Sequence, residues 1–296
     1  MLSVAYVGTQ NRHQNFYQQI ALVPYADLPA LQNGTSATPY NALVTYPGYH
    51  GINMSRNEAN GDYNGIQMSL RGSFLSNDLT YQLGYTYSHT NDPSNSGDMN
   101  SVSNPYAGWK YDWGPSQYDQ RQVFFANFVY DIPLMKHSDN HLMKTLVGGW
   151  EISGIIGAND GVPINLGVSG TNVCSQVPNC SNRPNLTGTA HNPHTVGEWF
   201  DTSVYSAPAA GTWGNAPRYN VRGPGRDNWN MSLFKNFTFS ESRGSYLQLR
   251  GEIFNVWNHT QLDPTQVSGN VGSGNFGAIT GAHDPRAIQL ALKLYF

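Results

Sequence analysis

Charged side chains are scarce in this chain of 296 residues. Only 12% of the residues are charged, whereas an ordinary soluble domain carries about 25%. The net charge of -3 provides no basic surface for nucleic acid, which we therefore exclude as a partner. Aromatic residues reach 12%, and tyrosine is the commonest of them with 18 copies. Few charges, many aromatics and many uncharged polar residues indicate a β-protein that contacts something apolar.

Long apolar runs are also missing. No stretch of 18 consecutive apolar residues occurs, so the sequence predicts no transmembrane helix. The first residues, MLSVAYVGTQNRHQ, have neither the basic start nor the apolar middle of a signal peptide.

Cysteine is limited to two residues, Cys174 and Cys180, in the stretch TNVCSQVPNCSN. Its Asn, Ser and Pro content predicts a loop. We expect a short disulfide between the two if the compartment is oxidising; the alternative is two free surface thiols. Two cysteines alone do not make a zinc site.

Alternation of apolar and polar residues is the strongest pattern in the chain, and it predicts β-strands. It is clear over residues 63–74, 78–90, 226–239, 245–257 and 286–296, and weaker over 1–9, 119–132 and 149–159. Lys235 interrupts the apolar side of its strand, and Phe234 interrupts the polar side. In the last strand the apolar side consists of Ile288, Leu290, Leu292, Leu294 and Phe296.

Strand length favours an all-β, antiparallel transmembrane β-barrel. Most of the eight predicted strands have about 10 to 14 residues, where ordinary strands have about 5 or 6 and a tilted bilayer-crossing strand needs about 9 to 11. A soluble two-sheet sandwich alternates in the same way and remains an alternative on pattern alone.

The connections between these strands alternate in length. Long ones cover residues 10–61, 91–117, 160–225 and 258–285, and short ones cover 75–77, 133–148 and 240–244. Transmembrane barrels sort their loops in this way, with short turns at the periplasmic end and long loops outside. Aromatic residues fall near both strand ends, as in the two girdles of a lipid-embedded barrel: Trp229, Trp257, Tyr85 and Tyr87 at one end, and Trp150, Tyr130, Phe237, Phe239 and Phe296 at the other.

The opposite strand faces carry Gln248, Arg250, Glu252, Gln289 and Lys293. Such groups are costly in lipid, so we expect them to face a wet or protein-filled interior.

Catalytic and metal motifs are weak. The histidines and acids in or near loops (His89, His259, His283, Asp263, Asp284) form no recognisable triad with serine, so we expect no enzyme activity and no cofactor. The pairs His191/His194 and His137/His141 lack the further ligands that a metal site requires, and solvated loop histidines are the simpler interpretation. The Gly-rich stretch 267–277 lacks the Lys-Ser/Thr ending of a phosphate loop.

Four stretches together resemble a known family: NPYAGWKYDWGPSQYDQRQVFFANFVYDIP, RGPGRDNWNMSLFKNF, GEIFNVWNHTQ and FGAITGAHDPRAIQLALKLYF. They are similar to the C-terminal barrel of TonB-dependent outer-membrane receptors of Gram-negative bacteria, in the Oar-like branch that bears a carboxypeptidase-regulatory-like domain. The similarity covers nearly all of residues 1–296 and is densest over 100–132 and 222–296. It implies an outer-membrane location and contact with membrane lipid.

The resemblance also implies roles for particular segments. In such barrels the last strand commonly ends in an aromatic residue and is the signal read by the barrel-assembly machinery; here that strand is 286–296, ending in Phe296. Receptors of this family have a signal peptide, a TonB box, a globular plug and about 22 strands. We therefore expect the eight strands to be the last third of a receptor, with TonB acting only through the missing N-terminal region.

As an intact receptor, the protein is expected to take up a scarce nutrient. Loops 10–61 and 160–225 are the first choice for ligand contact because they are longest and rich in aromatics: Tyr40, Tyr46, Tyr49, Trp199, Phe200 and Trp213. The ligand class stays open between a siderophore, a glycan fragment, a peptide and a cobalamin-like cofactor. Two alternatives remain: a standalone eight-stranded barrel with a structural or adhesion role, and a soluble secreted β-sandwich that binds carbohydrate.

Overall fold

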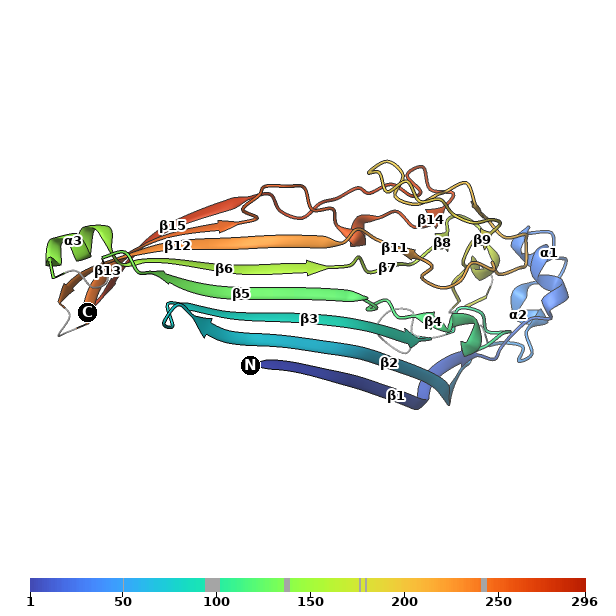
Figure 1. Ribbon diagram of the computed structural model, residues 1–296. Coiled ribbons are helices and arrows are strands. Elements are labelled where there is room, and N and C mark those ends of the chain that lie inside the picture. The colour runs from blue at the N-terminus through green and yellow to red at the C-terminus, as the bar shows by residue number, and fades with distance from the viewer. Residues whose placement is uncertain (50, 94–101, 136–138, 176, 179, 241–243) are drawn as a thin grey trace.

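The computed structural model describes residues 1–296 except 50, 94–101, 136–138, 176, 179 and 241–243. Within this described part, eight long strands and the short β4 form one antiparallel sheet, in which the long strands follow each other in chain order (Figure 1). The long strands are β1 (Leu2–Gln19), β2 (Asn53–Phe74), β3 (Leu79–Asp92), β5 (Gln122–Ile132), β6 (Trp150–Asn159), β12 (Arg226–Ser240), β13 (Ser245–Phe254) and β15 (Ala287–Tyr295).

The predicted all-β fold with eight long strands is confirmed. All eight lie in one sheet rather than in two stacked sheets, so the sandwich alternative does not describe this fold. Among the described residues, β1 pairs with β2 only and β15 pairs with β13 only. These two strands are therefore the edges of an open, curved wall, and the barrel is not closed.

The first two strands are longer than predicted. β1 continues to Gln19 instead of ending at residue 9, and β2 begins at Asn53 instead of 63. The predicted loop 10–61 is therefore only the segment 20–52. Residues 10–19 and 53–62 carry polar side chains on both faces, so the alternation that indicates a half-buried strand is lost there, although the backbone pairing continues past a register shift near Gln14.

The register sorts side chains onto two faces. One row of paired residues runs across the sheet as Phe74, Leu79, Tyr130, Ile152, Leu233, Gly251 and Leu290. The adjacent row runs as Ser73, Thr80, Val129, Ser153, Ser232, Glu252 and Gln289. Side chains alternate along a strand, so the two rows lie on opposite faces of the sheet. The face that carries the first row is the apolar face, and the face that carries the second row is the polar face.

The long connections gather at one end of the sheet, the loop end, on the right in Figure 1. They contain the short helices η1 (Tyr25–Asp27), α1 (Leu28–Gln32), α2 (Tyr40–Leu43), η2 (Trp109–Asp112), η3 (Val173–Ser175) and η4 (Pro264–Gln266). They also contain the two-residue strands β4 (Gly114–Pro115), β7 (Pro163–Ile164), β8 (Gly167–Val168), β9 (Asn185–Leu186), β10 (Tyr205–Ser206), β11 (Val221–Arg222) and β14 (Asn270–Val271). We call these packed connections the loop domain.

The opposite end, the turn end, holds the short connections and the C-terminus (Figure 1). The connection after β5 includes a helix that the sequence did not predict, α3 (His141–Val147). Its N-cap, Asn140, accepts a hydrogen bond from the Met143 amide at 3.2 Å. This is the usual way to satisfy a free helical N–H group. No helix in the described part of the chain is long and apolar enough to cross a membrane.

Candidate functional site

A hollow lies on the polar face, near the middle of the wall. Its volume is about 1040 Å³, and it spans strands β2, β3, β5, β6, β12 and β13. Polar-face residues that line it include Arg71, Gln82, Asn127, Ser153, Asn230 and Glu252. The polar face is thus the concave side, and it presents hydrogen-bonding side chains to the space that the wall curves around.

Further polar contacts continue this face toward the turn end. The Gln248 amide nitrogen donates to Asn236 Oδ1 at 2.9 Å, and Arg250 Nη2 donates to the Tyr295 hydroxyl at 3.1 Å. Gln248 pairs in register with Lys293. The residues expected to face a wet interior therefore lie on one face with the hollow.

The loop domain has its own hydrophobic cores. One contains Ile164, Leu166, Phe200, Tyr205, Ala216, Val221, Val267 and Ile279. A second joins segments 20–52, 102–113 and 160–225 through Val23, Leu28, Leu31, Val44, Val173 and Val177, with Tyr106 and Trp213 packed against them. A third joins Phe16 and Ala59 of the β1–β2 extension to Val102. The long connections therefore pack together as one unit and are not separate loops.

The six aromatic residues expected at the ligand do not form one site. Phe200 is fully buried in the first core, and Trp199 packs against that core while its indole N–H donates to the Arg222 carbonyl at 2.7 Å. Tyr40 and Trp213 pack against the second core. Only Tyr46 and Tyr49 are exposed. Four of the six therefore pack in the loop-domain cores, and ligand contact by these aromatic residues stays a prediction.

Cys174 and Cys180 form a disulfide with a Cα–Cα distance of 5.4 Å. Both cysteines pack against the second core of the loop domain. The bridge thus closes a short loop beside buried Val173 and Val177.

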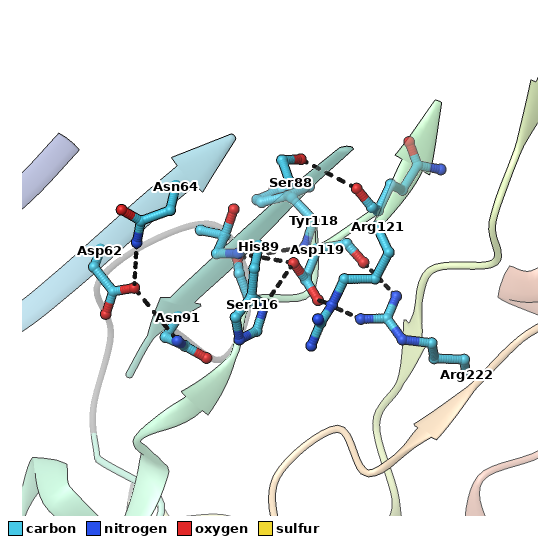
Figure 2. Close-up of polar contacts among 12 residues, drawn as sticks. Asp62, Asn64, Ser88, His89, Asn91, Ser116, Tyr118, Asp119, Arg121 and Arg222 are labelled. Carbon is cyan, nitrogen blue, oxygen red and sulfur yellow. Dashed lines mark hydrogen bonds and ion pairs between the residues drawn. The ribbon is translucent and has the colours of Figure 1, made fainter. Parts of the chain in front are cut away.

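Asp119 is the centre of a polar cluster at the junction of the sheet and the loop domain (Figure 2). Its buried carboxylate accepts hydrogen bonds from the Thr90 amide at 2.8 Å, from Arg121 Nε at 3.0 Å and from Arg222 Nη2. His89 Nδ1 lies 3.0 Å from the same carboxylate. Asp119 therefore joins the end of β3, the start of β5 and the distant strand β11.

Two opposing effects set the pKa of Asp119. Burial alone raises the pKa of a carboxyl group, but the donors from Thr90, His89, Arg121 and Arg222 outweigh it and lower the pKa below its ordinary value. The carboxylate is therefore ionised at neutral pH and serves as the counter-charge of two guanidinium groups.

A second buried polar cluster lies deeper in the loop domain. Arg218 Nη1 donates to the Asp112 carbonyl at 2.9 Å and to Asp92 Oδ1 at 3.2 Å. The Arg183 guanidinium stacks over the Tyr111 ring at 3.9 Å and lies 3.9 Å from Asp112. These contacts join segments 92–113 and 183–218. The sequence analysis did not predict these contacts. Because charged residues are so few in this chain, the Arg and Asp residues in its loops could have indicated them.

The candidate histidines are dispersed. His259 Nε2 lies 2.8 Å from Asp227, and His194 stacks on Trp199. His137 lies outside the described residues. Within the part of the chain that the structure describes, no group of three His, Cys, Asp or Glu residues is placed to hold a metal ion.

Comparison with protein families gives one match, which covers residues 1–289 and is described as "Outer membrane beta barrel domain". The chain belongs to this family of outer-membrane β-barrel domains. Comparison with curated proteins finds no match. The family places the protein in the bacterial outer membrane, as the sequence predicted.

For an outer-membrane barrel, the two faces have clear assignments. The apolar face contacts lipid and the polar face lines the interior, because lipid-facing and interior residues alternate in these barrels. The loop end is the extracellular end and the turn end is periplasmic. Trp229 and Trp257, whose rings contact at 5.8 Å, mark the outer rim of the apolar face, and exposed Phe239 and Phe296 mark the inner rim.

Proposed function

We propose that this outer-membrane barrel is part of a TonB-dependent receptor, in which these eight strands form one wall and the loop domain covers its extracellular end. The observation that carries the proposal is the hollow of about 1040 Å³ on the polar face of an open wall. In a closed eight-stranded barrel the interior is just wide enough for side chains to fill. A concave, polar and unfilled face fits the wall of a wider barrel better.

The edges of the sheet support a wide barrel as well. Unpaired backbone groups are costly in lipid, so β1 and β15 must both be hydrogen-bonded in the membrane. In the open wall these strands do not meet. Pairing with additional strands leaves the observed curvature unchanged, whereas closing the eight strands on themselves requires the wall to bend further.

Disulfide trapping distinguishes the two arrangements. In outer membranes, we would combine Val4→Cys in β1 with Ile288→Cys, Leu290→Cys or Leu292→Cys in β15, one pair at a time. Val4→Cys with Met68→Cys is the matched control, since Val4 and Met68 are paired in register and directly opposed residues are close enough for a disulfide. The receptor proposal predicts a bond in the control only. A bond between β1 and β15 would instead establish the standalone barrel.

Uptake needs a separate test in the source bacterium. The labelled nutrients to be tested are a ferric siderophore, cobalamin, an oligosaccharide and a peptide. We expect deletion of residues 160–225 to abolish the accumulation of one of them. Removal of TonB should abolish the accumulation of the same nutrient. Immunodetection must show equal amounts of the shortened and full barrels in the outer membrane. Unchanged accumulation of all four would contradict the proposal. Tyr46 and Tyr49 are the preferred ligand contacts because they are exposed at the loop end.

A further inference from the structure

The turn that follows β5 exposes apolar side chains at the periplasmic end of the wall. In α3, Leu142 is 70% exposed and Leu146 is 63% exposed, and Met143 is exposed beside them. Met135, just after β5, is exposed too. Exposing such a group of large apolar residues to water is unfavourable, and clusters of this kind mark contact surfaces.

The helix has two different sides. Lys144 lines a small hollow of about 240 Å³ together with Leu134 and with the polar-face residues Asp131, Glu151 and Asn236. Residues two apart on a helix point about 200° from each other, whereas residues four apart share a side. Leu142 and Leu146 therefore lie on the side of α3 opposite Lys144, away from the polar interior.

Lys235 fixes α3 against the wall. Its register places it on the apolar face, paired with Trp150 and Leu249, yet it is only 2% exposed. Its ammonium group donates to the carbonyls of Thr145, at 2.7 Å, and of Gly148. The ammonium also lies 4.9 Å from the centre of the Phe237 ring. Carbonyl groups at a helix C-terminus lack partners within the helix and interact favourably with a cation. Lys235, on a lipid-facing strand, therefore holds α3 at the inner rim.

We propose that α3 is an interfacial anchor, and that Leu142 and Leu146 insert into the phospholipid leaflet on the periplasmic side of the outer membrane. The occupant of this surface is lipid because the helix continues the lipid-contacting apolar face at Trp150 and Phe237, to which Lys235 connects it. Amphipathic helices at such a boundary bury their apolar side by about 5–10 Å. Lys235 is a positioning residue: it satisfies the helix C-terminus and keeps its own charge out of the lipid.

Depth-dependent quenching tests the anchor. The full chain is prepared in nanodiscs of native outer membrane as the Leu146→Cys variant, with Lys144→Cys as the control on the opposite side of α3. Both native cysteines are in the disulfide, so an NBD label reacts only at the new thiol. We expect the Leu146 label to be quenched more by 5-doxyl than by 16-doxyl stearate and to be shielded from iodide. We expect the Lys144 label to be quenched by iodide and to be shielded from both doxyl lipids.

Either of two results would overturn the anchor. Iodide quenching of the Leu146 label as strong as that of the Lys144 label would place α3 in water. Quenching of the Leu146 label by neither iodide nor doxyl lipid would mean that a protein covers this surface. Lys235→Met tests the positioning role, since it keeps the strand apolar but removes both donated hydrogen bonds. Doxyl quenching of the Leu146 label should then fall, and an unchanged value would refute that role.

Discussion

The Arg222 guanidinium contacts both the carboxylate and the backbone carbonyl of Asp119, a residue 103 positions earlier in the chain. Because Asp119 also accepts from Thr90 at the end of β3, this pair connects the membrane wall to the longest loop. Buried ion pairs cost desolvation but hold a specific geometry when their hydrogen bonds are complete. Here they connect β11 of the loop domain to the end of β3.

Replacing Asp119 with asparagine should loosen this junction. The variant removes the counter-charge of two guanidinium groups that are about one third exposed, and we expect a loss of about 1–2 kcal/mol in the stability of the loop domain. Hydrogen exchange of the Thr90 amide, which donates to Asp119, measures the change. Glu58→Gln removes an exposed ion pair with Arg56 and should cost about 0–1 kcal/mol. Equal exchange in both variants would refute the central role of Asp119.

The same carboxylate makes the loop domain acid-sensitive. The pKa of Asp119 is lower in the folded protein than its ordinary value, which is about 3.9 in an unfolded chain. Its contribution to stability is therefore complete above that ordinary value and is lost as the pH falls through the lowered folded pKa. The unfolding curves of the wild type and Asp119→Asn, measured from pH 7 downward, should converge at acid pH. Other titrating groups contribute equally to both proteins, so their effect cancels in the difference between the two curves. Asp112, whose pKa is raised by burial, is one such group. A difference that is constant with pH would contradict the assignment.

Phe200 and Tyr49 should separate packing from ligand contact. Phe200→Ala leaves a cavity in a loop-domain core, and we expect a loss of about 3–5 kcal/mol. Tyr49 is 63% exposed, so Tyr49→Ala should change stability by less than about 0.5 kcal/mol and act on nutrient binding instead. Thermal unfolding of the two variants provides the comparison. A stable Phe200→Ala variant with impaired binding would restore Phe200 as a ligand contact.

Cys174 and Cys180 should be unreactive until reduced. Thiol titration of the unfolded protein is expected to find no free thiol without reductant and two with it, since the two cysteines form a disulfide. Because the closed loop is short, replacing both with serine should cost about 2 kcal/mol by the chain-entropy relation. Two free thiols in protein isolated without reductant would show that the bridge is absent.

The sheet was predictable because a membrane wall imposes a strict pattern. Alternation between lipid and interior marks each strand where it crosses the bilayer, and the eight predicted strands have their counterparts in the structure. The pattern failed above the membrane, where β1 and β2 continue with polar residues on both faces. It also missed α3, because a helix of seven residues is too short to show a helical repeat.

The loop domain was far less predictable. Its order depends on contacts between residues distant in sequence, such as Arg218 with Asp92 and Tyr111 with Gly214. No local period signals such pairs. The size of Phe200 suggested recognition, but only the three-dimensional packing shows that it is a core residue.

The assignment of the two faces is the central claim, and neighbouring residues on β3 test it most directly. Gln82 lines the polar hollow, and Leu83 belongs to the apolar face. In isolated outer membranes, a membrane-impermeant maleimide should label Gln82→Cys readily and should label Leu83→Cys only after the protein is unfolded by heat in SDS. Equal labelling of the two variants in the membrane, or faster labelling of Leu83→Cys, would contradict the account.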